Sequence, residues 1–121
     1  VIFPDSTIAL DYLVHRMIFI LQNLLVYPEN MQDNIDKTGG LFYSQSLLLL
    51  LIEKGFTRED SYKIVQDMAM RVWKKEGTLK MLTLNSPEIK GKVTSDEIDK
   101  LFDINRYYKN IDAIYKKAGI I

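Results

Sequence analysis

The chain has 121 residues, of which 47% are hydrophobic and 26% charged, a composition typical of a soluble protein with a domain-sized core. Sixteen basic residues balance sixteen acidic ones, so no strong net charge favours binding to nucleic acid or to an anionic membrane. The absence of cysteine excludes disulfides, thiolate metal sites and a cysteine nucleophile, and the single histidine excludes a metal site that needs two imidazoles.

The first predicted element is a long apolar helix that ends near Val26. Pro4, followed by the oxygen-bearing residues Asp5, Ser6 and Thr7, is typical of a helix start. The apolar positions then follow a helical period and cover most of the circumference, which indicates several neighbouring helices. The sequence begins without methionine directly before this helix, and no basic-then-apolar signal segment opens it. We therefore expect a piece of a longer protein that is not directed to export.

The central predicted element is a helix over residues 41–54. Leu47 to Ile52 are all aliphatic, and Gly55 can end the helix as a left-handed cap. At about 1.5 Å per residue this helix spans roughly 21 Å, too short for a hydrocarbon core of roughly 30 Å. A helix that is apolar on all sides and lies outside lipid must be surrounded by other helices. We therefore predict a buried helix, preceded by a short helix over residues 29–36.

Four helical segments are predicted after the central helix. A capping sequence at residues 57–60 begins a helix to about residue 75, and a short helix or turn covers 78–84. After a polar loop, a second capping box begins a helix over 94–102, and the last helix covers 106–118. The predicted inward faces of the first and last of these four are Tyr62, Val65, Ala69, Val72 and Trp73, and Tyr108, Ile111, Ile114 and Tyr115. No strand pattern is present, so the predicted fold is all-α: one long helix followed by a compact helical domain.

Two polar groups within the helices could carry chemistry, and each has a structural explanation. His15 lies one turn after Asp11 on the same helix face, and an i, i+4 pair accounts for this histidine without a catalytic role. Ser44, Gln45 and Ser46 interrupt the apolar central helix, either as a hydrogen-bonded packing contact or as a substrate-facing patch.

Paired carboxylates are a third candidate for chemistry. Glu59-Asp60 and Asp96-Glu97 each stand at a predicted helix N-terminus, where the helix dipole favours negative charge, so capping is the favoured role. From the residues alone the chain is a helical domain without a complete active site.

Nearly the whole chain, taken in order, resembles the C-terminal part of the adenylosuccinate lyase family, in the fumarase/aspartase superfamily. The resemblance includes Phe-Pro-Asp-Ser-Thr-Ile-Ala-Leu-Asp-Tyr at residues 3–12 and Gly-Leu-Phe-Tyr-Ser-Gln at 40–45. Further matching segments are residues 27–31, 34–38, 51–55, 57–60, 65–66, 69–70, 101–103 and 111–115. The chain departs from the family at Gly39, where a larger residue is common, and at Ser46, where a basic residue is common.

The resemblance implies a cytoplasmic homotetramer that removes fumarate from adenylosuccinate, giving AMP, and from the succinylaminoimidazole-carboxamide ribotide of purine biosynthesis. Residues 1–27 would be the last helix of a central bundle shared by the subunits, and residues 28–121 a C-terminal helical domain. The catalytic serine loop and histidines of the family are absent here, and the residues that hold substrate phosphate would precede Val1. Only Pro4, Asp5 and Ser6 are expected near the site, and no cofactor or metal is implied.

Two other interpretations remain open from the sequence. The chain could be a free-standing helical interaction module, or the C-terminal part of another lyase of the same superfamily, such as one acting on argininosuccinate. The upstream sequence distinguishes them, because the serine signature loop must precede Val1 in the first interpretation.

Overall fold

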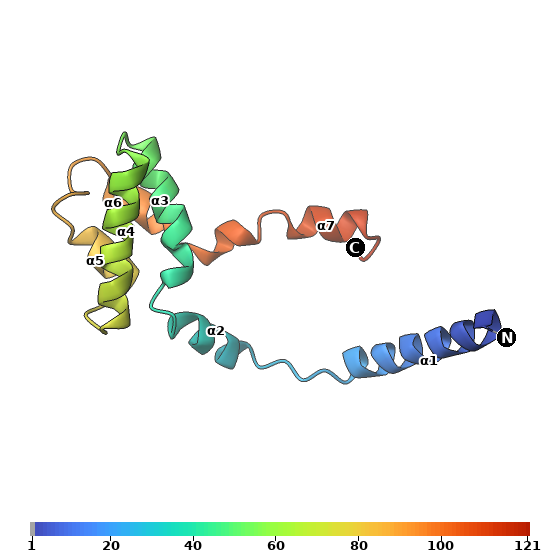
Figure 1. Cartoon of the computed structure of the whole chain (residues 1–121). Coiled ribbons are helices and arrows are strands. Elements are labelled where there is room, and N and C mark those ends of the chain that lie inside the picture. Colours follow the sequence, from blue (N-terminus) through green and yellow to red (C-terminus); the bar gives the residue numbers. More distant parts are fainter. Residues whose placement is uncertain (1) are drawn as a thin grey trace. The chain divides into compact units, whose positions relative to one another are not determined.

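The structure is a computed structural model that describes residues 2–121, and over that range it contains helices and no strand (Figure 1). The predicted all-α fold is confirmed. The elements, with η for a 3-10 helix, are α1 (Ile2–Gln22), α2 (Pro28–Asp36), η1 (Leu41–Tyr43), α3 (Ser44–Glu53), α4 (Arg58–Trp73), α5 (Leu79–Leu84), α6 (Ser95–Leu101), η2 (Ile104–Tyr107) and α7 (Ile111–Lys117). The chain divides into two compact units, Val1–Gln32 and Asp33–Ile121, which are described separately.

The N-terminal helix α1 is shorter at its C-terminal end than predicted. It stops at Gln22 rather than Val26. Asn23 donates both its backbone N–H, at 3.2 Å, and its side-chain amide, at 2.8 Å, to the carbonyl oxygen of Phe19. Such local side-chain bonds compete with continuation of a helix, and the proline at position 28 also disfavours helix immediately before it.

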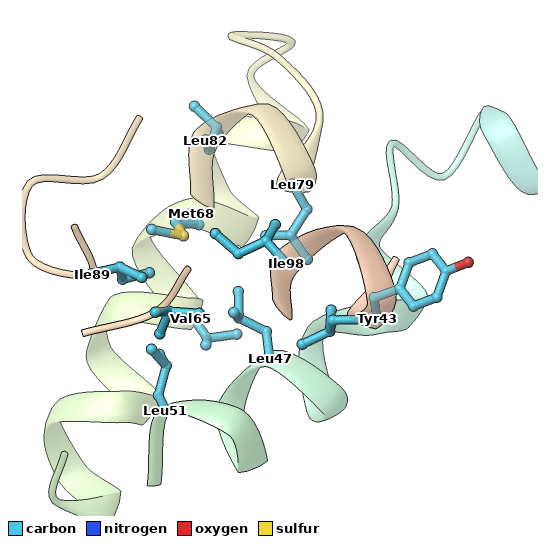
Figure 2. Close-up of a cluster of buried hydrophobic side chains, with 11 residues drawn as sticks. Tyr43, Leu47, Leu51, Val65, Met68, Leu79, Leu82, Ile89 and Ile98 are labelled. Atoms are coloured by element: carbon cyan, nitrogen blue, oxygen red, sulfur yellow. The ribbon is translucent and has the colours of Figure 1, made fainter. Parts of the chain in front are cut away.

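The core of the unit Asp33–Ile121 lies where α3, α4, α5 and α6 meet (Figure 2). Leu47 and Leu51 of α3 are fully buried, and Val65 and Met68 of α4 pack in the same cluster. Each fully buried aliphatic side chain contributes about 1.5–3 kcal/mol relative to exposure. The other members of the cluster are Tyr43, Leu79, Leu82, Ile89, Val93, Ile98 and Leu101.

The central helix is buried on one side only, so the prediction of burial all round is wrong. Leu47 and Leu51, one turn apart, have no exposed surface, whereas Leu49 on the opposite side is 57% exposed. Its first turn is the 3-10 helix η1. The predicted left-handed cap is confirmed, since Gly55 has φ 87° and Phe56 N–H donates to the carbonyl of Leu51 at 3.1 Å.

The buried face of α4 agrees only in part with the predicted one, since Val65 is buried and Val72 packs against the core as predicted. Ser61, Val65 and Met68 are buried, at i, i+4 and i+7 spacing. Tyr62 lies about 100° around the helix from Ser61 and is 58% exposed. Trp73 is 74% exposed. Both were predicted to face inward, and both instead leave apolar surface on the outside of this unit.

The predicted last helix is interrupted. The 3-10 helix η2 is set by Asp103, whose carboxylate accepts from the backbone N–H of Asn105 at 2.9 Å. Arg106 then donates through Nη1 to the carbonyl of Leu101 at 3.1 Å, and α7 begins only at Ile111. The predicted packing of this segment is wrong for Tyr108, Ile114 and Tyr115, which are 50%, 59% and 43% exposed, whereas Ile111 is half-buried.

Candidate functional site

Pro4, Asp5 and Ser6, the residues expected near a substrate, lie in the first turns of α1 and are exposed. Ser6 does not cap the helix as predicted, because the helix already begins before it. Its Oγ donates instead to the carbonyl of Ile2 at 2.8 Å, and Thr7 Oγ1 donates to that of Pro4 at 2.9 Å. Their proximity to a substrate stays a prediction.

His15 is paired as predicted with the residue one turn before it. Its Nδ1 lies 3.5 Å from a carboxylate oxygen of Asp11 and 3.0 Å from the Asp11 backbone carbonyl. Both side chains are about three-quarters exposed. An exposed i, i+4 pair of this kind stabilises a helix weakly and provides neither a cleft nor a second catalytic partner.

Ser44, Gln45 and Ser46 do not form one polar site. Ser44 Oγ donates to the carbonyl of Leu41 at 2.5 Å, which uses its hydroxyl within the helix turn. Gln45 lines an apolar groove with Leu48, Leu49, Ile52 and Tyr62, among others. Ser46 lines a different, charged cleft that also contains Glu53, Glu97, Lys100 and Arg106. The three side chains therefore point to different surroundings.

Both acid pairs lie in the first turn of a helix, as predicted, but only the carboxylate of Glu97 accepts a hydrogen bond from a backbone N–H. The backbone N–H of Asp60 donates to Thr57 Oγ1 at 3.1 Å at the start of α4. At the start of α6, Thr94 and Glu97 form a complete capping box. The ammonium group of Lys54 also hydrogen-bonds to Glu97. That bond, together with the bonds from Thr94, lowers the pKa of the Glu97 carboxyl to about 2. The carboxylate is therefore a structural anion at neutral pH.

Over residues 2–121, no cluster of three or more histidine, cysteine or carboxylate side chains could hold a metal ion. Over the same range, no helix is both long and apolar enough to cross a membrane.

In the N-terminal unit, α1 leaves many apolar side chains exposed. The helix has 21 residues and none of them is buried. Apolar patches of this extent on a soluble protein mark interaction sites, since water-exposed surface of this kind is unfavourable. We name this surface the α1 apolar face. Its members include Ile8, Leu10, Leu13, Val14, Met17, Ile18, Phe19, Ile20 and Leu21, each at least 45% exposed.

The sequence interpretation missed one feature, an open pocket beside the end of α4. It is lined by Lys37, Thr38, Leu41, Phe42, Val72, Trp73 and Lys75. Trp73 had been assigned to the core because it follows the helical spacing of apolar residues. Lys74 and Lys75, which directly follow Trp73, were the signal that this end of the helix faces solvent.

Comparison with known proteins places most of the chain in one family. The family model described as "Adenylosuccinate lyase C-terminus" matches residues 40–118. The adenylosuccinate lyase of Bacillus subtilis (strain 168) is 42% identical over 120 residues, and that of Streptococcus mutans serotype c is 41% identical over 120 residues. Each alignment covers 99% of this chain and 28% of the relative, so the chain spans little more than a quarter of the length of these relatives.

Proposed function

The chain belongs to the adenylosuccinate lyase C-terminus family, and from this premise we propose that it is the non-catalytic C-terminal part of a cytoplasmic enzyme of purine biosynthesis. That enzyme would eliminate fumarate from adenylosuccinate, giving AMP, and from the succinylaminoimidazole-carboxamide ribotide. The observation that carries the proposal is the identity of 42% over 99% of the chain with a protein named adenylosuccinate lyase.

In this proposal the chain contributes scaffold and subunit contacts. Residues 1–27 would be the last helix of a bundle built by a homotetramer, and residues 28–121 the C-terminal helical domain. The α1 apolar face supports this role, because a helix with no buried residue and little charge needs other helices around it. Pro4, Asp5 and Ser6 would approach the nucleotide substrate only in the assembled enzyme.

The side chains in the described residues that could carry chemistry already have partners, which supports a structural role for them. His15 is satisfied by Asp11, Ser44 by its own helix, and Glu97 by Lys54 and Thr94. A general base needs a partner and a cleft around a reacting atom. We propose that the catalytic base and its partner lie in the segments that precede Val1, as the resemblance implies.

The test is to assay the full-length protein for fumarate release, with adenylosuccinate and argininosuccinate as parallel substrates. The proposal expects turnover of adenylosuccinate and none of argininosuccinate. Turnover of argininosuccinate alone would assign the chain to another lyase of the superfamily. The absence of the serine signature loop upstream of Val1 would remove the catalytic assignment and favour the interaction module.

A further inference from the structure

Trp73 lines a pocket that no structural role described above explains. It is the only tryptophan of the chain, and 74% of its surface is exposed. With Leu41, Phe42 and Val72 it forms the apolar part of a pocket of about 600 Å³ within the unit Asp33–Ile121. Pockets that hold small ligands usually measure about 300–1,000 Å³ and are mostly apolar with a few polar groups.

The polar groups of this pocket are basic. Lys37 and Lys75 complete the lining together with Thr38, and none of its described lining residues carries a carboxylate. The ammonium group of Lys37 donates to the side-chain oxygen of Asn34 at 3.3 Å, a neutral partner that leaves the positive charge in place. Both lysines are exposed, so their ammonium groups remain charged and accessible to an anionic ligand that enters the pocket.

The walls of the pocket are fixed by backbone contacts. The carbonyl of Gly39 accepts from the backbone N–H of Leu79 at 2.8 Å, and a Cβ at Gly39 would lie 2.6 Å from Val72 Cγ1. Lys75 has φ 61°, and its N–H donates to the carbonyl of Val72 at 2.9 Å. The N–H of Lys37 donates to the carbonyl of Asp33 at 2.9 Å. Both lysine backbones are thus held in place without a ligand, which reduces the entropy lost on binding.

We propose that this pocket binds a small anion that carries a planar aromatic ring. The ring packs on Trp73 and Phe42, and the acid group lies between Lys37 and Lys75. Thr38 Oγ1 already donates to the carbonyl of Ile35 at 2.7 Å, so the lysines are the donors for the anion. Ring packing and charge-assisted hydrogen bonding act together in such a site. This binding site is independent of the proposed lyase reaction, because all the residues that line the pocket lie in this chain.

The experiment uses guanosine monophosphate, which combines a planar ring with a phosphate. Guanosine lacks the phosphate and ribose 5-phosphate lacks the ring. Each is titrated into the 121-residue chain while the fluorescence of Trp73, the only tryptophan, is recorded. We expect saturable quenching by guanosine monophosphate. We expect the other two compounds to bind at least about tenfold more weakly, since each loses one of the two kinds of contact.

Charge variants test the anion contact. Lys37→Gln and Lys75→Asn should each weaken binding by roughly fivefold to tenfold. Asparagine is chosen at position 75 because it tolerates a positive φ. Lys90→Gln, an exposed lysine outside the pocket, is the matched control and should leave binding unchanged. Circular dichroism checks that each variant is folded. If Lys75→Asn does not fold, the anion contact is tested by Lys37→Gln and by the salt dependence of binding.

Three results would overturn the proposal. The first is equal affinity for guanosine and guanosine monophosphate, and the second is unchanged binding by both lysine variants. The third is a change of Trp73 emission with protein concentration in the absence of nucleotide, recorded in a Leu13→Glu, Ile20→Glu variant so that association through α1 is removed. Such a change would mean that a second copy of the chain occupies the pocket.

Discussion

The ammonium group of Lys54 hydrogen-bonds to the carboxylate of Glu97, forty-three residues later in the chain. Lys54 is the C-cap of α3, and Glu97 belongs to the capping box of α6. One carboxylate thereby holds the start of α6, through the backbone N–H of Thr94 at 3.0 Å, and joins it to the end of α3. The contact links a local helix signal to tertiary packing.

Glu97→Gln should lower the free energy of unfolding at neutral pH and have no effect at low pH. The folded-state pKa of Glu97 is about 2, below the ordinary value of 4.5. Its carboxylate therefore contributes stability above pH 4.5, and this contribution is lost as the pH falls through about 2. Urea unfolding of the chain and its variant over this pH range measures the difference. A difference that stays constant with pH would contradict the ion-pair account.

Leu51→Ala should destabilise the unit Asp33–Ile121 by about 2–5 kcal/mol, because it leaves a cavity in a fully buried site. Leu49→Ala, two positions earlier on the same helix, is the matched control. Leu49 is 57% exposed, so its truncation should change stability by no more than about 0.5 kcal/mol. Chemical denaturation gives both values. Equal losses would mean that both sides of α3 are covered in solution.

Gly39→Ala should destabilise the fold by more than Gly91→Ala. Both glycines have positive φ, so both substitutions cost about 1 kcal/mol or more in backbone strain. At Gly39 the new methyl group would also lie 2.6 Å from Val72 Cγ1, whereas nothing lies within 4 Å at Gly91. Thermal unfolding measures the two losses. The double variant Gly39→Ala with Val72→Ala should relieve the clash and restore part of the lost stability. If it restores none, the close approach of Gly39 to Val72 is refuted.

The α1 apolar face should drive self-association of the chain. Leu13 and Ile20 lie seven positions apart on one side of the helix and are 62% and 55% exposed. Replacing both by glutamate should reduce the associated fraction, and Gln22→Glu, which adds charge on the polar side, should not. Light scattering reports the mass. A clean monomer whose α1 amides are protected from hydrogen exchange would contradict the prediction.

Local signals in the sequence were sufficient to predict most of the helices and three of their caps. Thr57, Thr94 and Gly55 act in the structure as their patterns indicate, because a cap depends on residues within one turn. The end of α1 and the break before α7 were missed, since each depends on side-chain bonds to the backbone, from Asn23 and Asp103, that do not alter the apolar period.

Burial was predicted less well than secondary structure. Helical spacing identifies apolar positions but not which of them another element covers, and Tyr62 and Trp73 were assigned to the core on spacing alone. Leu49 was assigned to the core because it belongs to an unbroken aliphatic run. The pocket beside Trp73 depends on Gly39 meeting Val72, a contact between distant positions that no local pattern encodes. The expectation that this chain holds no complete catalytic constellation rests on the single histidine and on the positions of the acid pairs at helix starts, and it stays a prediction.

The central claim is that this chain is the non-catalytic part of a lyase, and fumarate release tests it most directly. The 121-residue chain and the full-length protein are assayed side by side with adenylosuccinate. The account predicts turnover by the full-length protein and none by the 121-residue chain. Turnover by the 121-residue chain at the rate of the full-length protein would contradict it.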